Sequence, residues 1–432
     1  MLKRLELRNV GPASHLALNP VAPRFNFLTG DNGLGKSFLL EAAWWALTRT
    51  WHESPAVPNS PEASISYSFD GLGKPHAYTS RWDIKKQQWN RSSGRPPNPG
   101  LVIYARVDGS FSVWDPARNY VVWQRADGGN LESPPSYQFT TRSVLYGLRR
   151  TINLTGIAQE ELICAGLIDD WTRWHDIKEK SHEYRMLCRL LEKLGPDDQP
   201  LTPGNPVAPY FGDQRRIPTI HMPYGQDVPI TYAPAGVRRM TMLAYLLAWC
   251  FSEHQRACLH INQPLTSQII VLIDEPETHL HPRWQRTVLP SLFQAINSWN
   301  NNSKAYQPVI QFIAATHAPL VMASMESIFD STKDALWKLD LSGQSVTLEK
   351  DIFYKRGDVN RWLRSDVFDL AEATSREVEK AISKAAKLSS DAEPDCQEVK
   401  LTDKLLIKLL PEQDPFYARW RYLMSRYLEP MS

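Results

Sequence analysis

The sequence predicts an α/β protein with a parallel core sheet, and three observations carry this prediction. A short apolar run, Arg24–Thr29, precedes the glycine-rich stretch Gly30–Ser37, which leads into an apolar stretch of helical length, Phe38–Thr50. Two later runs, Gln268–Asp274 and Pro308–Thr316, are almost continuously apolar. Such runs are typical of strands that are buried on both faces of a parallel sheet. A strand–loop–helix unit followed by strands of this kind is the pattern of an α/β fold.

Composition and charge limit the class of protein further. At 432 residues the chain is long enough for two or three structural units. A net charge of +2 gives little general attraction for nucleic acid, so such binding would need a local basic patch. Five cysteines without CxxC spacing indicate free thiols in a reducing cytoplasm. The sequence shows neither a secretion signal nor an apolar stretch of membrane-spanning length, so we expect a cytoplasmic protein without membrane contacts.

The stretch GDNGLGKS has the spacing of a phosphate-binding loop. Its glycines allow a tight turn whose N–H groups point at phosphate oxygens, and the following helix begins with its positive dipole end toward the same anion. Lys36 can reach the β- and γ-phosphates, and the Ser37 hydroxyl can ligate Mg²⁺. A simple glycine-rich turn, the alternative, explains neither Asn32 nor the flanking strand and helix. The residues expected to contact ATP are Gly30, Asp31, Asn32, Gly33, Leu34, Gly35, Lys36, Ser37 and Phe38.

Residues 1–139 are predicted to form an N-terminal lobe that is rich in strands. Leu2–Val10 alternates between apolar and charged residues and predicts an opening edge strand, and a second short strand is expected near Leu16–Leu18. From Ala63 to Arg125, turn residues separate five segments that predict an antiparallel β-subdomain: ISYSF, HAYTSRW, LVIYARV, FSVW and YVVWQR. Packing within the sheet explains their aromatic residues more simply than a platform for stacking bases.

Residues 140–209 are predicted to form a helical insertion, or lid. The run SVLYGLRRTINL and the amphipathic stretch from Glu160 to Leu194 have helical spacing, and a proline-rich segment follows. Residues 210–350 are predicted to form a second lobe, which opens with a hairpin over Tyr210–Pro234. The next segment, Ala235-Gly236-Val237-Arg238-Arg239, places a glycine and a basic pair at the start of an apolar helix. That start could receive an anion, although an ordinary capped core helix is the simpler interpretation.

Chemistry-bearing side chains follow the two buried strands of this second lobe. Asp274 and Glu275 end the first strand, where two carboxylates are costly to place without a cation. We expect Asp274 to hold Mg²⁺ with Ser37, and Glu275 to polarise an attacking water. His317 ends the second strand and is placed to contact a γ-phosphate. An acidic turn and a structural histidine are the alternatives. The HxH in Thr278–Pro282 suggests zinc, but no third ligand lies near it in the sequence.

Residues 351–432 are predicted to form a C-terminal helical extension. It follows a hairpin made of DALWKLDLS and QSVTLEKDIF. Four helical segments are expected, over Gly357–Leu370, Ser375–Leu388, Leu401–Leu410 and Pro415–Leu428. The last of these is both aromatic and basic. It suits docking on the protein's own core, pairing with another subunit, or contact with nucleic acid.

Four motifs therefore stand in order: GDNGLGKS, AGVRR, VLIDEPETHLHP and ATHAP. This series resembles the ABC-type ATPases of the RecF and SMC group. It is more closely similar to AAA-annotated ATPases of bacterial anti-phage defence systems of the PARIS, Septu or retron type. The resemblance implies an ABC-ATPase head that hydrolyses ATP with Mg²⁺. It implies Lys36, Glu275 and His317 as catalytic residues, and Ser37 and Asp274 as metal ligands.

The resemblance also implies an assembly. In proteins similar to this one, ATP lies between the phosphate loop of one protomer and the signature segment of another, which implies a homo-oligomer with Gly236 contacting ATP in trans. It implies a glutamine near the metal, for which Gln138 is the candidate. The signature usually has a serine two residues before its glycine, where this chain has Pro234. Proline offers neither a hydroxyl nor an N–H, so we expect slow turnover.

The 115 residues after His317 contain no DxD motif and no histidine, so they have neither a Toprim signature nor an HNH motif. We therefore expect that this chain is not itself the nuclease. The resemblance implies a sensor or regulatory ATPase for a separately encoded effector, such as a Toprim or HNH nuclease, with DNA or a phage protein as trigger. The alternative is a DNA-binding repair ATPase of RecF type. A transporter's nucleotide-binding subunit fits less well, because such chains lack this insertion and extension.

Overall fold

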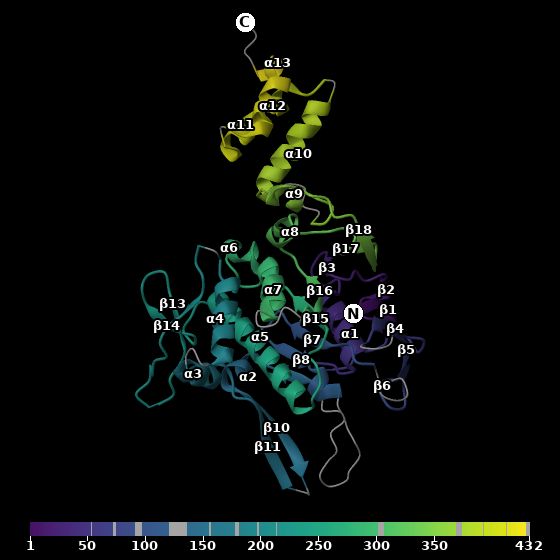
Figure 1. Ribbon diagram of the computed structural model, residues 1–432. Helices are drawn as coiled ribbons and strands as arrows, with labels where there is room; N and C mark the ends of the chain where they lie inside the picture. The colour runs from purple at the N-terminus through teal and green to yellow at the C-terminus, as the bar shows by residue number, and fades with distance from the viewer. Residues whose placement is uncertain are drawn as a thin grey trace. The chain divides into compact units, whose positions relative to one another are not determined.

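A computed structural model of the chain is shown in Figure 1. It describes residues 1–52, 54–71, 75–90, 97–120, 136–154, 157–177, 181–196, 198–212, 214–300, 306–368, 374–391, 393–411 and 413–428. The chain divides into two compact units, Met1–Gly357 and Asp358–Ser432.

The core of the first unit is an eight-stranded sheet of order β18-β17-β3-β16-β15-β7-β8-β9. Its five central strands run parallel to one another: β17 (Ala335–Ser342), β3 (Phe25–Thr29), β16 (Val309–Ala315), β15 (Gln268–Asp274) and β7 (Leu101–Ala105). Antiparallel strands close its two edges: β18 (Ser345–Asp351) on one side, and β8 (Phe111–Trp114) and β9 (Tyr137–Phe139) on the other. The predicted α/β fold with a parallel core is confirmed.

A second, five-stranded antiparallel sheet has the order β2-β1-β4-β5-β6. Its strands are β1 (Leu2–Val10), β2 (Ala13–Leu18), β4 (Ser64–Asp70), β5 (Pro75–Asp83) and β6 (Gln88–Trp89). The prediction of β1 as an edge strand is wrong, because β1 pairs with β2 on one side and β4 on the other. An edge strand has a neighbour on one side only, whereas β4, which follows α1 in the chain, pairs with the second side of β1.

The segment LVIYARV was also assigned wrongly. It supplies β7, which pairs in parallel with β15 in the core sheet and is not part of the antiparallel sheet. The reason is visible in its composition: Leu101, Val102, Ile103 and Tyr104 are all buried, as expected of a strand covered on both faces. The segment FSVW forms β8, which pairs antiparallel with β7 but belongs to the core sheet and not to the predicted antiparallel subdomain. The predicted strand YVVWQR lies outside the described residues except for Tyr120, which ends a short π-helix, Pro116–Tyr120.

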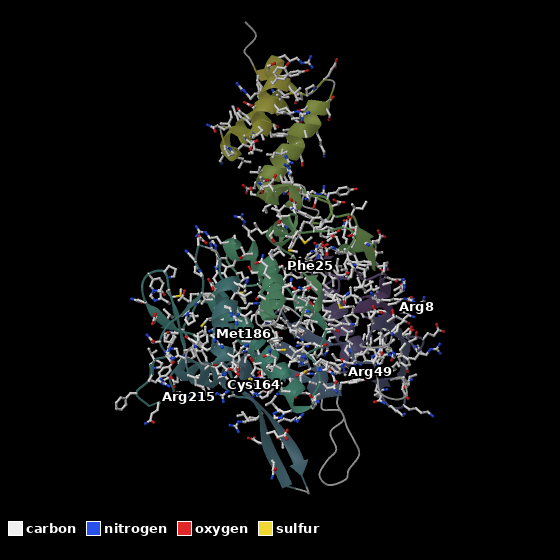
Figure 2. All side chains as sticks on the ribbon, viewed as in Figure 1. Arg8, Phe25, Arg49, Cys164, Met186 and Arg215 are labelled. Atoms are coloured by element: carbon white, nitrogen blue, oxygen red, sulfur yellow. The ribbon has the colours of Figure 1, made fainter. Side chains whose placement is uncertain are left out.

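Helix α1 (Lys36–Thr48) lies between the two sheets. Ten of its thirteen residues are buried, which explains why its apolar residues are spread around the helix instead of forming one stripe. The opposite face of the core sheet carries Phe25 and Phe312, which pack on Phe293 of α7 (Val288–Asn297). Phe25 is labelled within the body of this unit in Figure 2. The strands that hold the candidate site are therefore covered on both faces.

The predicted helical insertion is only partly helical. Helices α2 (Thr141–Tyr146), α3 (Leu167–Ile177) and α4 (His182–Leu194) form, but β10 (Leu148–Leu154) and β11 (Ile157–Cys164) make a hairpin between α2 and α3. Gly147, with φ of 101°, ends α2, and Arg149–Glu160 and Arg150–Glu161 pair across the strands. The helical prediction for 147–164 is wrong, because charge pairs that suit a helix suit a ladder as well. Figure 1 shows the hairpin projecting from the rest of the unit.

After α4, the strands β12 (Thr202–Pro203), β13 (Thr219–His221) and β14 (Asp227–Pro229) form a small antiparallel sheet. The pairing of β13 with β14 confirms the predicted hairpin. Helix α5 (Ala235–His260) follows and packs on α4. Two short helices, α6 (Pro282–Gln285) and α8 (Pro319–Met325), complete the unit with the 3₁₀ turn Ser298–Asn300. In the part of the chain that the structure describes, no helix is both long and apolar enough to cross a membrane.

The second unit is helical, as predicted for the C-terminal extension. Its helices are α9 (Val359–Leu363), α10 (Arg376–Ser390), α11 (Cys396–Leu409), α12 (Pro415–Leu423) and α13 (Ser425–Leu428). Helices α10 to α13 share an apolar core around Leu406 and Trp420, and the Trp420 indole donates a hydrogen bond to Asp403 Oδ1 at 3.1 Å. The helix expected over Gly357–Leu370 is reduced to α9, and residues 369 and 370 lie outside the described part.

Candidate active site

The loop Gly30–Ser37 is held in a backbone conformation that requires glycine. Gly30 has φ of 126°, and a Cβ there would lie 2.1 Å from the carbonyl oxygen of Leu339 in β17. Gly35 has φ of 99° and caps α1, and its Cβ would lie 2.5 Å from Pro12. Any side chain at either position would displace a neighbouring element. The loop is thereby fixed between β17 and the turn that joins β1 to β2, with α1 beginning at Lys36.

The remaining loop residues divide into exposed and packed ones. Asp31, Asn32 and Gly33 are exposed, as residues that meet a soluble ligand should be. Leu34 is buried, and Phe38 is half-buried close to Gly11. These last two were predicted among the ATP contacts. Their packing gives them a structural role in seating the loop on the antiparallel sheet.

Lys36 is drawn back into its own loop. Its Nζ donates to the carbonyl oxygens of Gly30 and Asp31, both at 2.7 Å, and the side chain is buried. Burial lowers the pKa of this ammonium, while the carboxylates of Glu275 and Asp274 act in the opposite direction. The two carbonyls use two of the three N–H donors of an ammonium. Lys36 is thus a buried cation that faces the two strand-end carboxylates.

Asp274 ends β15 and meets α1. Its carboxylate is 3% exposed, and burial raises its pKa, with the charge of Glu275 adding to the rise. A hydrogen bond with the Ser37 side chain and the charge of Lys36 oppose that rise. A buried carboxylate beside a hydroxyl is a donor set that fits Mg²⁺, which prefers oxygen ligands and is commonly held by one or two protein groups plus phosphates and waters. The predicted pair Ser37–Asp274 is therefore brought together.

Glu275 follows directly and has a left-handed backbone, with φ of 44°. Its N–H donates to the carbonyl oxygen of Ala315 at 2.9 Å, which ties it to the end of β16. One carboxylate oxygen, Oε2, accepts from Thr278 Oγ1 at 2.9 Å, and the other, Oε1, lies 3.3 Å from His317 Nε2. Burial and the nearby Lys36 lower the pKa of His317, while Glu275 opposes this. The net lowering favours a neutral imidazole beside a carboxylate.

The sequence interpretation missed Glu277. Its carboxylate is 8% exposed, and Oε1 accepts two hydrogen bonds at 2.8 Å, from Thr316 Oγ1 and from the His317 N–H. Burial raises its pKa, and these hydrogen bonds oppose the rise. The other oxygen, Oε2, is buried without a hydrogen-bond partner among the described residues. Glu277 fixes the backbone of His317. The second acid of the segment Asp274-Glu275-Pro276-Glu277 was the available signal.

Arg239, near the start of α5, contacts the backbone that follows β15. Its guanidinium donates from Nη1 to the carbonyl oxygen of Val107 at 2.7 Å and from Nη2 to that of Glu275 at 3.0 Å. Gly236 lies against the same loop, since a Cβ there would be 2.8 Å from the carbonyl oxygen of His279. Sequence reasoning had noted the basic pair only as a possible anion receiver. The predicted contact of Gly236 with ATP in trans stays a prediction.

Gln138 is not brought to the other predicted metal ligands. It lies in β9, where Nε2 donates to the carbonyl oxygen of Trp51 at 2.9 Å and Oε1 lies 3.0 Å from His52 Nδ1. In the described part of the chain, no hydrogen bond joins Gln138 to Ser37 or Asp274. Its role near the metal stays a prediction.

The zinc alternative for His279 and His281 gains no support from the geometry. His281 caps α6, where its Nδ1 accepts from the Arg283 N–H at 3.4 Å. Within the described ranges, no three His, Cys, Asp or Glu side chains gather as a metal site.

The family model "AAA domain, putative AbiEii toxin, Type IV TA system" matches residues 170–323, which include β15, the carboxylates and His317. "Retron Ec83 probable ATPase" of Escherichia coli is 32% identical over 109 residues, which is 25% of this chain and 16% of that protein. "Retron Vc95 probable ATPase" of Vibrio cholerae serotype O1 biovar El Tor is 40% identical over 67 residues, 16% of this chain and 11% of that protein.

Among solved structures, the SMC head domain from Thermotoga maritima is 13% identical, with a TM-score of 0.38 over 81% of this chain and 99% of that one. An Smc head domain with an extended coiled coil, bound to the C-terminal domain of ScpA from Pyrococcus furiosus, is 12% identical, with a TM-score of 0.40 over 81% of this chain and 96% of that one.

The chain thus has an α/β fold, and its residues 170–323 are similar to the AAA domain family. More particularly, the chain is similar to the ATPases of defence systems, and its curated relatives are named for retrons. The matched segments span less than a fifth of those relatives.

Proposed function

We propose that this chain binds ATP with Mg²⁺ and hydrolyses it, and that it acts as the regulatory ATPase of a separately encoded effector. One observation carries the catalytic part of the proposal. Residues from α1, β15 and β16 converge at the carboxyl end of the core sheet, where the Ser37 side chain acts to lower the pKa of Asp274 and His317 Nε2 lies 3.3 Å from Glu275 Oε1. Ligands of open α/β sheets bind at this end of the strands.

Each side chain has a distinct task in this proposal. Backbone N–H groups of the phosphate loop and Lys36 hold the phosphates and stabilise negative charge as it develops. Glu275 accepts a proton from the attacking water or orients it, and His317 contacts the γ-phosphate from the next strand. Ser37 and Asp274 would hold Mg²⁺, which supplies charge neutralisation at the β- and γ-phosphates.

The left-handed backbone of Glu275 and the hydrogen bond from Thr278 set the direction of its carboxylate. Glu277 sets the backbone of His317. The geometry therefore supports a preorganised pair of groups aimed at one phosphate.

The assembly part of the proposal rests on the start of α5. Gly236 is only half-buried, and Pro234 and Ala235 are exposed at the N-terminus of this 26-residue helix. We propose that this surface closes the nucleotide site of a second copy in a homo-oligomer. Pro234 lacks the hydroxyl and the N–H that would contact the γ-phosphate, so we expect slow hydrolysis.

ATP turnover by the chain with Glu275→Gln tests the catalytic part. The variant should keep ATP affinity but lose turnover about 100-fold or more, because the general base is neutralised. Lys36→Ala should lose ATP affinity. Glu349→Gln is the matched control, since Glu349 is exposed in β18, outside the site. Turnover by Glu275→Gln equal to that of Glu349→Gln would contradict the proposal.

The effector part needs its own test. In the cytoplasm of a host that carries the neighbouring genes, the tagged chain should co-purify with a nuclease such as a Toprim or HNH protein. Glu275→Gln should change phage restriction, with DNA or a phage protein as the trigger. Recovery of the chain alone, together with unchanged restriction by Glu275→Gln, would contradict a regulatory role.

A second candidate function is ATP-dependent DNA binding of RecF type. It is supported by a cleft on the exposed face of the antiparallel sheet, where Arg4, Arg8 and Arg81 lie with serine and threonine hydroxyls. Duplex DNA binding that weakens with salt and with Arg81→Glu would support this candidate. Absence of binding with ATP at low salt would remove it.

A further inference from the structure

A cavity of about 300 Å³ lies beside the candidate active site and is separate from its phosphate loop. It is bounded by the turn between β7 and β8, the first three turns of α5, and the loop after β15. Its volume is that of a small-molecule site. None of the phosphate-loop residues lines it.

Most of the cavity wall is apolar and well buried. Phe111 of β8, Ile273 of β15, and Met240 and Leu246 of α5 are each 1–2% exposed. Leu243, one turn before Leu246, is half-buried and also lines the space. Such a wall accommodates an aromatic or aliphatic body and gives it no hydrogen bonds.

Two arginines lie at one end of the cavity. Arg106 is 7% exposed. Its Nε donates to Glu41 at 2.8 Å and its Nη1 to Ser112 Oγ at 2.8 Å, but Nη2 is buried without a hydrogen-bond partner among the described residues. A buried guanidinium N–H left unpaired is costly. Arg238, on α5, lines the same cavity, and its guanidinium makes no hydrogen bond or ion pair in the described part of the chain.

Glu41 pairs with Arg106 Nε at 2.8 Å, so Arg238 supplies the positive charge at this end of the cavity. Asp108 is turned to its own loop, where its Oδ1 accepts the Ser110 N–H at 2.8 Å. Arg239 is occupied by the carbonyl oxygens of Val107 and Glu275. His279 completes the lining from the loop after β15. A carboxylate or phosphate in the cavity can therefore meet the free donors of Arg238, whereas the buried Nη2 of Arg106 lies behind the wall.

We propose that this cavity binds a small organic anion, with its acid group on Arg238 and its apolar body against Phe111, Leu243 and Leu246. The bound anion bridges the β7–β8 turn and α5. Arg239 links these same two elements to the carbonyl oxygen of Glu275, so occupancy changes the position of the candidate general base. This regulatory effect rests on the proposed ATPase function, whereas binding itself does not.

Calorimetric titration of the full chain with 2-naphthoate, without nucleotide, tests the binding. We expect one saturable site per chain and weaker binding of the neutral 2-naphthamide. Arg238→Gln should weaken naphthoate binding about tenfold through loss of a charge-assisted hydrogen bond. Leu243→Trp should fill the cavity and abolish binding. Arg256→Gln, on the exposed part of the same helix, should bind as the unchanged chain does, and circular dichroism verifies that each variant is folded.

Equal binding of naphthoate and naphthamide would overturn the anion site, as would naphthoate binding that neither Arg238→Gln nor Leu243→Trp alters, or the absence of saturable binding. Lys36→Ala should bind naphthoate normally, so a failed nucleotide site and a failed anion site are distinguishable. If naphthoate binds but ATP turnover is the same with and without it, the link to Glu275 is overturned.

Discussion

The two sheets of the first unit each hold a buried glutamate, and the groups around these two carboxylates differ. Glu6 lies in β1 of the antiparallel sheet and is 4% exposed, and Glu277 follows β15 of the core sheet and is 8% exposed. Two arginines and a histidine surround Glu6: Arg8 Nε donates at 2.7 Å, His15 Nε2 lies at 3.0 Å, and Arg4 also donates to it. Glu277 has a hydroxyl, a backbone N–H and one oxygen without a partner in the described structure.

The pKa values of the two carboxyls follow these surroundings. Burial acts to raise the pKa of Glu6, but hydrogen bonds from Arg8, Arg4 and His15 outweigh it and lower the value to about 2. Burial raises the pKa of Glu277, and its hydrogen bonds only moderate the rise. Figure 2 labels Arg8 at the margin of the antiparallel sheet. A buried carboxylate whose hydrogen bonds outweigh the cost of burial, like Glu6, is expected to stabilise the fold. A buried carboxylate whose hydrogen bonds do not, like Glu277, is a candidate for a functional role.

The largest expected effect on turnover comes from removing the carboxylate of Glu277. Glu277→Ala should lower kcat for ATP about 100-fold, because Thr316 and the His317 backbone lose their acceptor. Glu277→Gln keeps an acceptor oxygen and should recover most of the rate. Steady-state turnover and urea unfolding measure both properties. A fall in stability with unchanged kcat would break the comparison.

The opposite result is expected for the carboxylate of Glu6. Glu6→Ala leaves Arg4, Arg8 and His15 without their common partner and should lower the free energy of unfolding by about 2 kcal/mol, while kcat stays the same. Urea unfolding measures it, with Glu62→Ala as the control because Glu62 is exposed on the same cleft. Loss of turnover without loss of stability would show that Glu6 belongs to a functional site.

Protonation of Glu6 at low pH should lower the free energy of unfolding. Its folded-state pKa of about 2 lies below the ordinary value of 4.5. The stabilisation is therefore complete above about pH 5 and is lost as the pH falls toward 2, by at most about 2 kcal/mol at pH 3. Urea unfolding across this range should show less acid dependence in Glu6→Gln than in the unchanged chain. Parallel curves for the two proteins would contradict the assignment.

The smallest effect should follow from Arg239→Lys. Lysine keeps the charge but cannot donate to Val107 and Glu275 through a planar fork. We expect kcat to fall about threefold to tenfold, corresponding to one weakened hydrogen bond, with ATP affinity unchanged. Equilibrium nucleotide binding and turnover separate the two quantities. An equal loss of affinity would place Arg239 among the nucleotide contacts.

Much of the core and of the site could be predicted because its signals are local. The run Gln268–Asp274 matches β15 residue for residue, and a continuous apolar strand ending in acids has few other interpretations. The convergence of Lys36, Asp274, Glu275 and His317 also follows from the sequence, since the carboxyl ends of parallel strands share one edge.

The predictions that were wrong concern which strands pair and which groups hydrogen-bond, and the local sequence pattern does not specify these partners. Strand character in LVIYARV was visible, but its neighbour β15 lies more than 160 residues away in the chain. The hairpin of β10 and β11 carries its charges as adjacent pairs, Arg149–Arg150 and Glu160–Glu161, which have no strand periodicity. Arg239 joins Val107 to Glu275 only once three distant segments are folded. The acceptor of a hydrogen bond of this kind has no sequence signal.

The left-handed backbone at Glu275 has a further consequence for selection. An L-residue other than glycine or asparagine is strained at φ of 44°, by about 1 kcal/mol. Glu275→Gly relieves the strain while removing the carboxylate that the proposed reaction needs. A screen for thermal tolerance alone would therefore reward loss of this side chain. The proposed reaction supplies a reason for glutamate at this position that stability alone does not give.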